Sequence, residues 1–272
     1  MLQIDSAAYT NQGHNSQLNQ NTIFHRVNQP GSSVSNGLFV VSAGLGEHQA
    51  GIIASKIAIK TITEALTAPL LLSDAQPKPL PETPTISLED AIKAANVNIR
   101  RYAQENLSFG ERMGATLTAA LIQGEAVEFA NIGNGRAYVW RDGTLTQITQ
   151  DHSLAAKLAA RGVIDRKDIP YHPYNSVVLR ALGVTDEIEV DTFTWQYRPG
   201  DKLLLCSDGL WKAAGIDERL NRWLKADVSV TDLCRQLANQ TRIRNSSDTI
   251  HTIVVRIDEV DEALTQDGCN VI

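Results

Sequence analysis

The period of apolar and polar residues divides the N-terminal third of the chain into strands and helices. Alternation predicts an early strand around Ile4–Tyr9, and a continuous apolar run predicts another at 38–42. Isoleucine and leucine at helical spacing then predict a helix from about Glu47 to Leu66. The segment Pro69–Pro84 holds five of the nine prolines, so we expect no regular structure there.

A second helix is expected to begin at Ser87, whose spacing to Asp90 resembles a capping box. From residue 114 the period changes to two, and glycine-containing turns separate short apolar runs. Asn-Gly and Asp-Gly are strong hairpin signals, so we expect an antiparallel meander. Its predicted strands are 116–122, 126–132, 136–140 and 144–148, and its turns include Gly133-Asn134-Gly135.

The C-terminal half alternates less regularly between the two periods. The expected elements are a helix at 152–162, strands at 175–181, 188–195 and 201–206, a helix at 229–240 and a strand at 249–257. Helices lie between groups of strands without a strict strand-helix-strand alternation, which favours an α+β fold with helices on sheet faces. We expect one domain over residues 1–257 and an acidic tail over 258–272.

Composition narrows the functional classes. A net charge of -6 without a Lys/Arg cluster argues against a nucleic-acid surface. The sequence contains no apolar run of membrane-spanning length and no basic leader, so neither a membrane nor a signal peptide is expected. Three widely spaced cysteines indicate a reducing compartment, and we expect a cytoplasmic protein.

Candidate chemistry lies at the ends of three apolar strands. Asp208 follows Leu203–Cys206, Asp248 precedes the last strand, and Ala43 stands at what looks like the equivalent place after Val41. Strand-end carboxylates that converge are suited to a hard divalent cation. The chain therefore presents two acids and a methyl group where three acids would make a metal site.

Several segments together resemble the metal-dependent Ser/Thr protein phosphatases of type 2C, the PPM family. They run in family order over nearly the whole chain: Phe39–His48, Met113–Leu117, Asn131–Tyr138, Asp151–Leu154, Leu179–Gly183, Pro199–Leu210 and Asp248–Val255. The resemblance implies a four-layer αββα sandwich of two antiparallel sheets flanked by helices, with a metal cleft between the sheets. It also implies Ser/Thr phosphoprotein phosphatase chemistry with Mg²⁺ or Mn²⁺.

The departures from the family pattern fall on its functional positions. Ala43 replaces the aspartate that bridges the two metal ions, and Asn134 replaces an aspartate linked to a further metal. The phosphate-binding arginine aligns with Ser16. An acidic pair aligns with Gln20 and Asn21, and the asparagine after the last aspartate is Thr249.

The residues that match the family site are Asp208, Asp248, Gly44 (a backbone-carbonyl ligand in the family) and His48, the candidate general acid. Glu47 replaces a family glycine and could reach the cleft, although an acid in the first turn of a helix commonly faces water. Because the changes delete negative charge, we expect no divalent cation at high occupancy, and at most one weakly bound Mg²⁺ or Mn²⁺.

These residues favour a degenerate, pseudophosphatase-like domain that binds a protein partner, such as a phosphoprotein or a kinase, without hydrolysing it. One alternative is an active phosphoprotein phosphatase whose rearranged metal site uses Asp208, Asp248, Glu47 and His48. A second alternative is a structural subunit of a larger assembly, because a fold does not fix a function.

Overall fold

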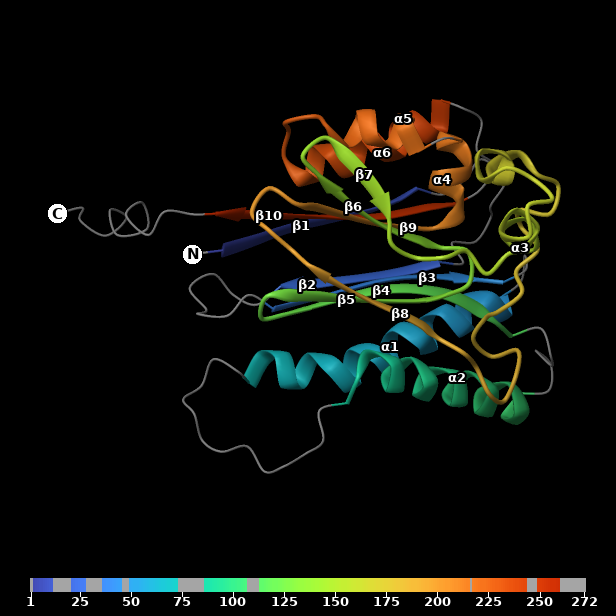
Figure 1. Cartoon of the computed structure of the whole chain (residues 1–272). Helices are drawn as coiled ribbons and strands as arrows, with labels where there is room; N and C mark the ends of the chain where they lie inside the picture. The colour runs from blue at the N-terminus through green and yellow to red at the C-terminus, as the bar shows by residue number, and fades with distance from the viewer. Residues whose placement is uncertain are drawn as a thin grey trace.

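The computed structural model describes residues 2–11, 21–27, 36–45, 49–72, 86–106, 113–215, 217–243 and 249–259. Two antiparallel five-stranded sheets lie face to face (Figure 1). Sheet 1 has the order β1 (Leu2–Asn11), β10 (Ile250–Glu259), β9 (Lys202–Cys206), β6 (Arg136–Arg141) and β7 (Thr144–Gln147). Sheet 2 has the order β2 (Asn21–Val27), β3 (Asn36–Gly44), β4 (Ala115–Gln123), β5 (Ala126–Ile132) and β8 (Asp191–Gln196).

Helices cover the outer face of each sheet (Figure 1). On sheet 2 they are α1 (Gln49–Leu72) and α2 (Leu88–Glu105). On sheet 1 they are α4 (Asp208–Ala214), α5 (Asp217–Leu224) and α6 (Val230–Ile243). The short helices α3 (Leu154–Ala160) and η2 (Arg166–Tyr171) lie at one edge of the sandwich. The expected αββα architecture is therefore confirmed.

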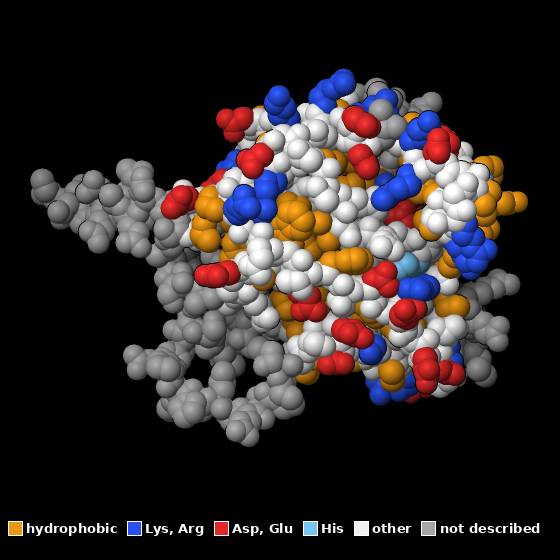
Figure 2. All heavy atoms as spheres, in the orientation of Figure 1, with side chains coloured by type: hydrophobic (Ala, Val, Ile, Leu, Met, Phe, Trp, Pro, Cys, Tyr) orange, Lys and Arg blue, Asp and Glu red, His pale blue; other side chains and the backbone are white. Residues whose placement is uncertain are grey.

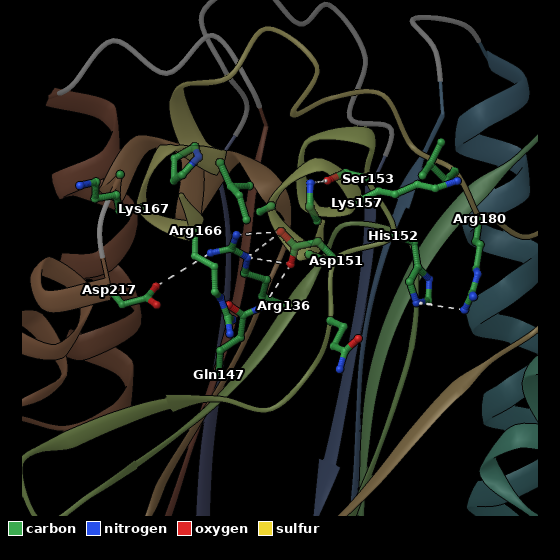
Figure 3. Close-up of a pocket in the computed structure, with 18 of the residues that line it drawn as sticks. Arg136, Gln147, Asp151, His152, Ser153, Lys157, Arg166, Lys167, Arg180 and Asp217 are labelled. Carbon is green, nitrogen blue, oxygen red and sulfur yellow. Dashed lines mark hydrogen bonds and ion pairs between the residues drawn. The ribbon is translucent and has the colours of Figure 1, made fainter. Parts of the chain in front are cut away.

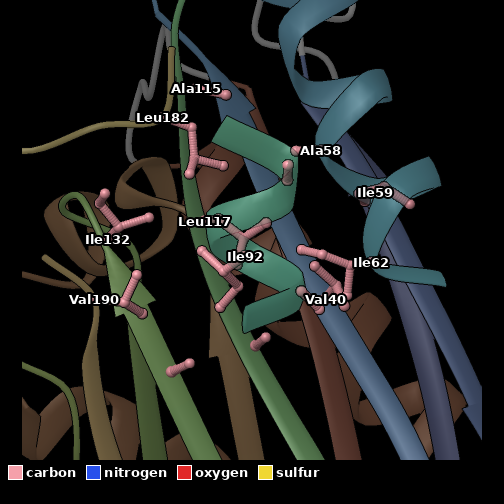
Figure 4. Packing of buried hydrophobic residues seen from close by; sticks show 14 of the residues in the cluster. Val40, Ala58, Ile59, Ile62, Ile92, Ala115, Leu117, Ile132, Leu182 and Val190 are labelled. Atoms are coloured by element: carbon pink, nitrogen blue, oxygen red, sulfur yellow. The ribbon is translucent and has the colours of Figure 1, made fainter. Parts of the chain in front are cut away.

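Three apolar layers hold the sandwich together, and strand alternation assigns each side chain to a layer. Val40 faces α1 and α2, where it lies in one cluster with Ile62 and Ile92 (Figure 4). Phe39 and Val41, its neighbours in β3, face the other sheet and join the core between the sheets. The third layer packs α4, α5 and α6 against the outer face of sheet 1.

Several sequence predictions are confirmed at the level of single residues. Ser87 is the N-cap of α2, and its side chain accepts a hydrogen bond from the backbone N–H of Asp90 at 3.0 Å. Ile92 and Ile99 of this helix are fully buried and belong to its core-facing side. β10 continues through Glu259, two residues past the expected end of the domain at residue 257, and residues 260–272 lie outside the described part.

The expected meander is wrong at Gly133-Asn134-Gly135. β5 pairs with β4 and β8 in sheet 2, whereas β6 pairs with β9 and β7 in sheet 1. The segment between them is a crossover from one sheet to the other, not a hairpin turn. Local turn chemistry is similar in both cases, so the sequence does not reveal the change of partner.

Three further predictions need correction. The strand expected at 175–181 is irregular, with one isolated bridge at Val178, because no neighbouring strand is available to pair with it. α1 continues through Pro69 to Leu72, since one proline removes a single N–H donor from the helix. β2 was not expected, because its segment has few apolar residues.

No helix in the described part of the chain has both the length and the apolar composition to span a bilayer.

Candidate functional site

Asp208 is the centre of the candidate site and the first residue of α4. β9 ends at Cys206, and Ser207 is the N-cap of the helix that follows, so Asp208 lies at a strand end that has become a helix start. Its Oδ2 atom accepts hydrogen bonds from Asn134 Nδ2 at 3.1 Å and from Lys212 Nζ at 2.5 Å. The carboxylate expected to bind a metal is therefore already paired with a cation of the chain.

The Lys212 ammonium is held in place from several sides. It also donates to Ser176 Oγ at 2.8 Å, and its Nζ lies 5.7 Å from the centroid of the Trp211 ring. Only 12% of the Lys212 side chain is exposed, so the ion pair with Asp208 is largely shielded from water. Such shielding strengthens the attraction between the two charges.

Ala43 lies near the end of β3, on the face that looks toward the other sheet. It has the same parity as Phe39 and Val41, which pack between the sheets. The register places the backbone of Asn21 opposite Ala43 on one side and that of Thr116 on the other. The sequence prediction that position 43 belongs to the cleft is consistent with this placement, and its methyl group offers no metal ligand.

Gly44 follows Ala43 and approaches α1 closely. A Cβ atom at Gly44 would lie 2.3 Å from the backbone carbonyl carbon of Gly51, and one at Gly51 would lie 2.8 Å from the carbonyl oxygen of Leu45. Such distances are shorter than any van der Waals contact, so both positions require glycine. This contact fixes where β3 ends relative to α1.

Asn134 lies in the crossover between the sheets and is almost completely buried. Its side chain binds Asp208, and its backbone carbonyl accepts from Trp211 Nε1 at 2.9 Å. The preceding residue, Gly133, donates its N–H to His152 Nδ1 at 3.1 Å. The crossover is thus anchored to α4, which positions Asn134 beside the carboxylate.

His251 is a further residue near the site, and the sequence reading did not select it. It is fully buried in β10, and its Nδ1 atom lies 2.8 Å from Thr10 Oγ1. Its Nε2 atom has no hydrogen-bond partner among the described residues. Burial lowers the pKa of His251 to about 3, against the opposing effect of the Asp208 carboxylate. The imidazole is therefore neutral at physiological pH.

The described donors do not fit a pair of divalent cations. No group of three His, Cys, Asp or Glu side chains comes together within the part of the chain that the structure describes. Asp208 is shared with an ammonium, Ala43 supplies no ligand, and Asn134 directs an N–H donor at the carboxylate. Two closely spaced dications need several negative ligands to offset their repulsion, and this set provides one.

The remaining predicted site residues have different outcomes. Thr249 directly precedes β10, and its carbonyl accepts a hydrogen bond from Ser207 Oγ at 3.3 Å. Asn21 is placed in β2 by its backbone. The other predicted positions lie outside the described residues: Ser16, Gln20, Glu47, His48 and Asp248.

Cys206 and the tryptophans belong to the core rather than to a site. Cys206 is buried, and burial raises the pKa of its thiol well above the ordinary value, which is typical of an inert core cysteine. Trp211 is buried beneath the helices of sheet 1; Trp140 and Trp223 pack against the same cluster, and Trp195 packs against the core between the sheets. Lys212 was missed, although its spacing of four residues from Asp208 is the spacing of a helical ion pair.

Comparison with known proteins adds an independent line of argument. A family model described as "Protein phosphatase 2C" matches residues 10–253. The Serine/threonine phosphatase stp of Listeria monocytogenes is 32% identical over 255 residues, which cover 94% of this chain and 93% of that protein. Protein phosphatase PhpP of Streptococcus pneumoniae is 28% identical over 253 residues, covering 93% of this chain and 97% of the relative.

Solved structures agree with the fold. The crystal structure of Stp1 from Staphylococcus aureus has a TM-score of 0.79 at 28% identity and covers 94% of this chain and 96% of its own. The catalytic domain of PstP, in complex with two manganese ions, has a TM-score of 0.76 at 27% identity. The match covers 95% of this chain and 100% of the PstP chain.

Proposed function

The chain belongs to the protein phosphatase 2C family, and from this premise we propose a non-catalytic role for it in Ser/Thr phosphorylation signalling. In this role the domain binds a protein partner that carries phosphoserine or phosphothreonine. It retains the scaffold of a phosphatase and lacks the charge needed to hold a metal pair.

The ion pair of Asp208 with Lys212 is the observation that carries the proposal. A divalent cation at Asp208 would lie close to the ammonium, and the two would repel each other strongly at low exposure to water. Ala43 removes the carboxylate that would offset this repulsion. The Asn134 amide adds a second donor where a metal site needs acceptors.

Metal-dependent hydrolysis needs a cation that activates water and polarises the phosphoryl group. Weak cation binding therefore lowers the fraction of molecules able to react, whatever the other residues do. The loss of a phosphate-binding arginine, with serine at position 16, would remove a bidentate contact as well. The combined effect argues against efficient turnover.

Active phosphatase chemistry is the second candidate, and the comparisons favour it over the first. The relatives above are named as phosphatases, and one solved neighbour holds two manganese ions. In this alternative Asp208 exchanges Lys212 for a metal ion, and the rearranged site also uses Asp248, Glu47 and His48. The geometry at Asp208 favours the first candidate.

Calorimetric titration with Mn²⁺, followed by hydrolysis of p-nitrophenyl phosphate and of a phosphothreonine peptide in excess Mn²⁺, tests the two candidates. We expect weak or no Mn²⁺ binding and no turnover above that of an Asp208→Ala control. Metal-dependent turnover that Asp208→Ala abolishes would establish the second candidate.

A further inference from the structure

A cavity of about 800 Å³ lies beside the candidate site, between the α3–η2 segment and the start of α5 (Figure 3). Its inner wall contains Arg136, whose guanidinium lies 3.8 Å from the centroid of Trp211. Trp211 donates a hydrogen bond to the Asn134 carbonyl, so one tryptophan links Arg136 of the cavity lining to the residue that binds Asp208. Asp208 and Gly44, the expected metal-binding residues that the structure describes, do not line this cavity.

The cavity is lined by more cations than anions. Arg136, Lys157, Arg166, Lys167 and Arg180 face three acids, Asp151, Asp217 and Glu218. This excess is notable because the whole chain carries a net charge of -6. The excess belongs to the lining alone, because acids just outside it pair with Arg180 and Lys167.

Most of these charges already have partners. Arg136 binds Asp151 through its Nε at 2.8 Å and its Nη2 at 2.7 Å, and both side chains are almost fully buried. Arg180 pairs with Asp191 and Glu189, which lie outside the cavity lining. Lys167 pairs with Asp165, also outside the lining, at 3.1 Å.

Lys157 and Arg166 remain available. Neither side chain forms an ion pair with another residue in the described part of the chain, and both are exposed. They come from different elements, α3 and η2, so they approach the cavity from separate segments. Two unpaired cations at one cavity are suited to a doubly charged anion such as a phosphate monoester.

Exposed apolar side chains occur on the chain segment that contributes most of the cavity lining. Val163 and Tyr171 are each 64% exposed, Leu179 is 46% exposed, and Leu179 itself lines the cavity. In Figure 2 hydrophobic and basic side chains lie next to each other at the right-hand edge, where Figure 1 draws α3 and the segment after it. Apolar surface beside an anion site is typical of a protein-binding surface.

We propose that this cavity binds a phosphorylated serine or threonine of a partner polypeptide, with Lys157 and Arg166 contacting the phosphate. Val163, Tyr171 and Leu179 contact apolar residues that flank the phosphorylated position. This inference rests on the proposed function, since it assigns the phosphoprotein a site on the domain. It places recognition beside the Asp208 cleft rather than in it.

Fluorescence anisotropy tests the proposal with a labelled phosphothreonine peptide flanked by leucine and valine, and with its unphosphorylated twin. We expect the wild-type protein to prefer the phosphorylated peptide. The double substitution Lys157→Glu with Arg166→Glu should raise its Kd about tenfold or more, because two charge-assisted contacts are reversed. Lys56→Glu with Lys60→Glu on α1 makes the same charge change on the far layer and should leave the Kd unchanged.

Three results would overturn the cavity assignment. The first is an equal Kd for the phosphorylated and the unphosphorylated peptide. The second is an equal rise in Kd for the α1 control variant and the cavity variant. The third is that inorganic phosphate displaces the labelled peptide at the same concentration as the unlabelled phosphopeptide does. The last result would mean that the apolar surface adds nothing. The Mn²⁺ turnover assay is separate, so turnover in the wild-type protein would contradict the non-catalytic role and leave the peptide result valid.

Discussion

Lys212 places its ammonium 2.5 Å from Asp208 Oδ2, one helical turn further along α4. Both side chains are mostly shielded, and Asn134 binds the same carboxylate oxygen. In the proposed non-catalytic role, Lys212 provides the positive charge beside Asp208 that a metal ion would otherwise supply.

Removing the ammonium should free Asp208 for metal. We expect Lys212→Met to lower the Kd for Mn²⁺ about tenfold, equivalent to ~1.4 kcal/mol, because the cation no longer meets a positive charge. Isothermal titration calorimetry measures the change, with the exposed Lys225→Met as a control of equal charge. An unchanged Kd would show that Lys212 does not compete with the metal.

Restoring carboxylates should have a larger effect on metal binding. Ala43 and Asn21 are opposite each other in the register of β2 and β3, so Ala43→Asp with Asn21→Asp places two acids side by side. We expect the double variant to bind Mn²⁺ measurably more tightly than either single variant in calorimetry. If all three bind alike, the two positions do not share a ligand sphere.

Gly44→Ala should destabilise the fold, because the added Cβ would meet the Gly51 backbone at 2.3 Å. We expect a loss of about 3 kcal/mol in the free energy of unfolding, measured by urea denaturation. Gly124→Ala is the comparison: it has open space and a φ of 60°, so it should cost only ~1 kcal/mol. Equal losses would contradict the steric argument.

His251 should make stability fall in mild acid. The unfolded histidine takes up a proton below its ordinary pKa of 6.5, whereas the folded one stays neutral down to about 3. Protons therefore favour the unfolded chain between these values, and by pH 5 the loss from this residue should reach about 2 kcal/mol. His251→Gln, which does not titrate, should show a smaller loss between pH 7 and pH 5 in urea denaturation. Parallel curves for the two proteins would exclude this role.

Much of the fold could be predicted from local pattern. The Ser87–Asp90 cap marked the start of α2, and the continuous apolar run at 38–42 predicted β3, which is buried on both faces. Partner choice was harder, because hydrogen-bond pairing depends on distant strands. The crossover at Asn134 therefore looked like a hairpin, and Val178 looked like part of a strand.

The candidate site was predicted in part. Asp208 and Ala43 were selected correctly as strand-end positions, and the structure places Asn134 against Asp208. Lys212 and His251 were missed, because both act through tertiary contacts. Lys212 was missed because no helix was predicted directly after residue 206, and His251 reads from sequence as one polar residue in an apolar strand.

The crossover at Gly133–Gly135 also has a mechanical consequence. It joins the two sheets covalently, and Asn134 at its centre is tied to α4 through Asp208 and Trp211. If one sheet moved relative to the other, these hydrogen bonds would be strained together with the apolar contacts between the sheets. The Asp208 carboxylate is therefore attached to the segment that joins the two sheets, so a change in their relative position would alter its surroundings.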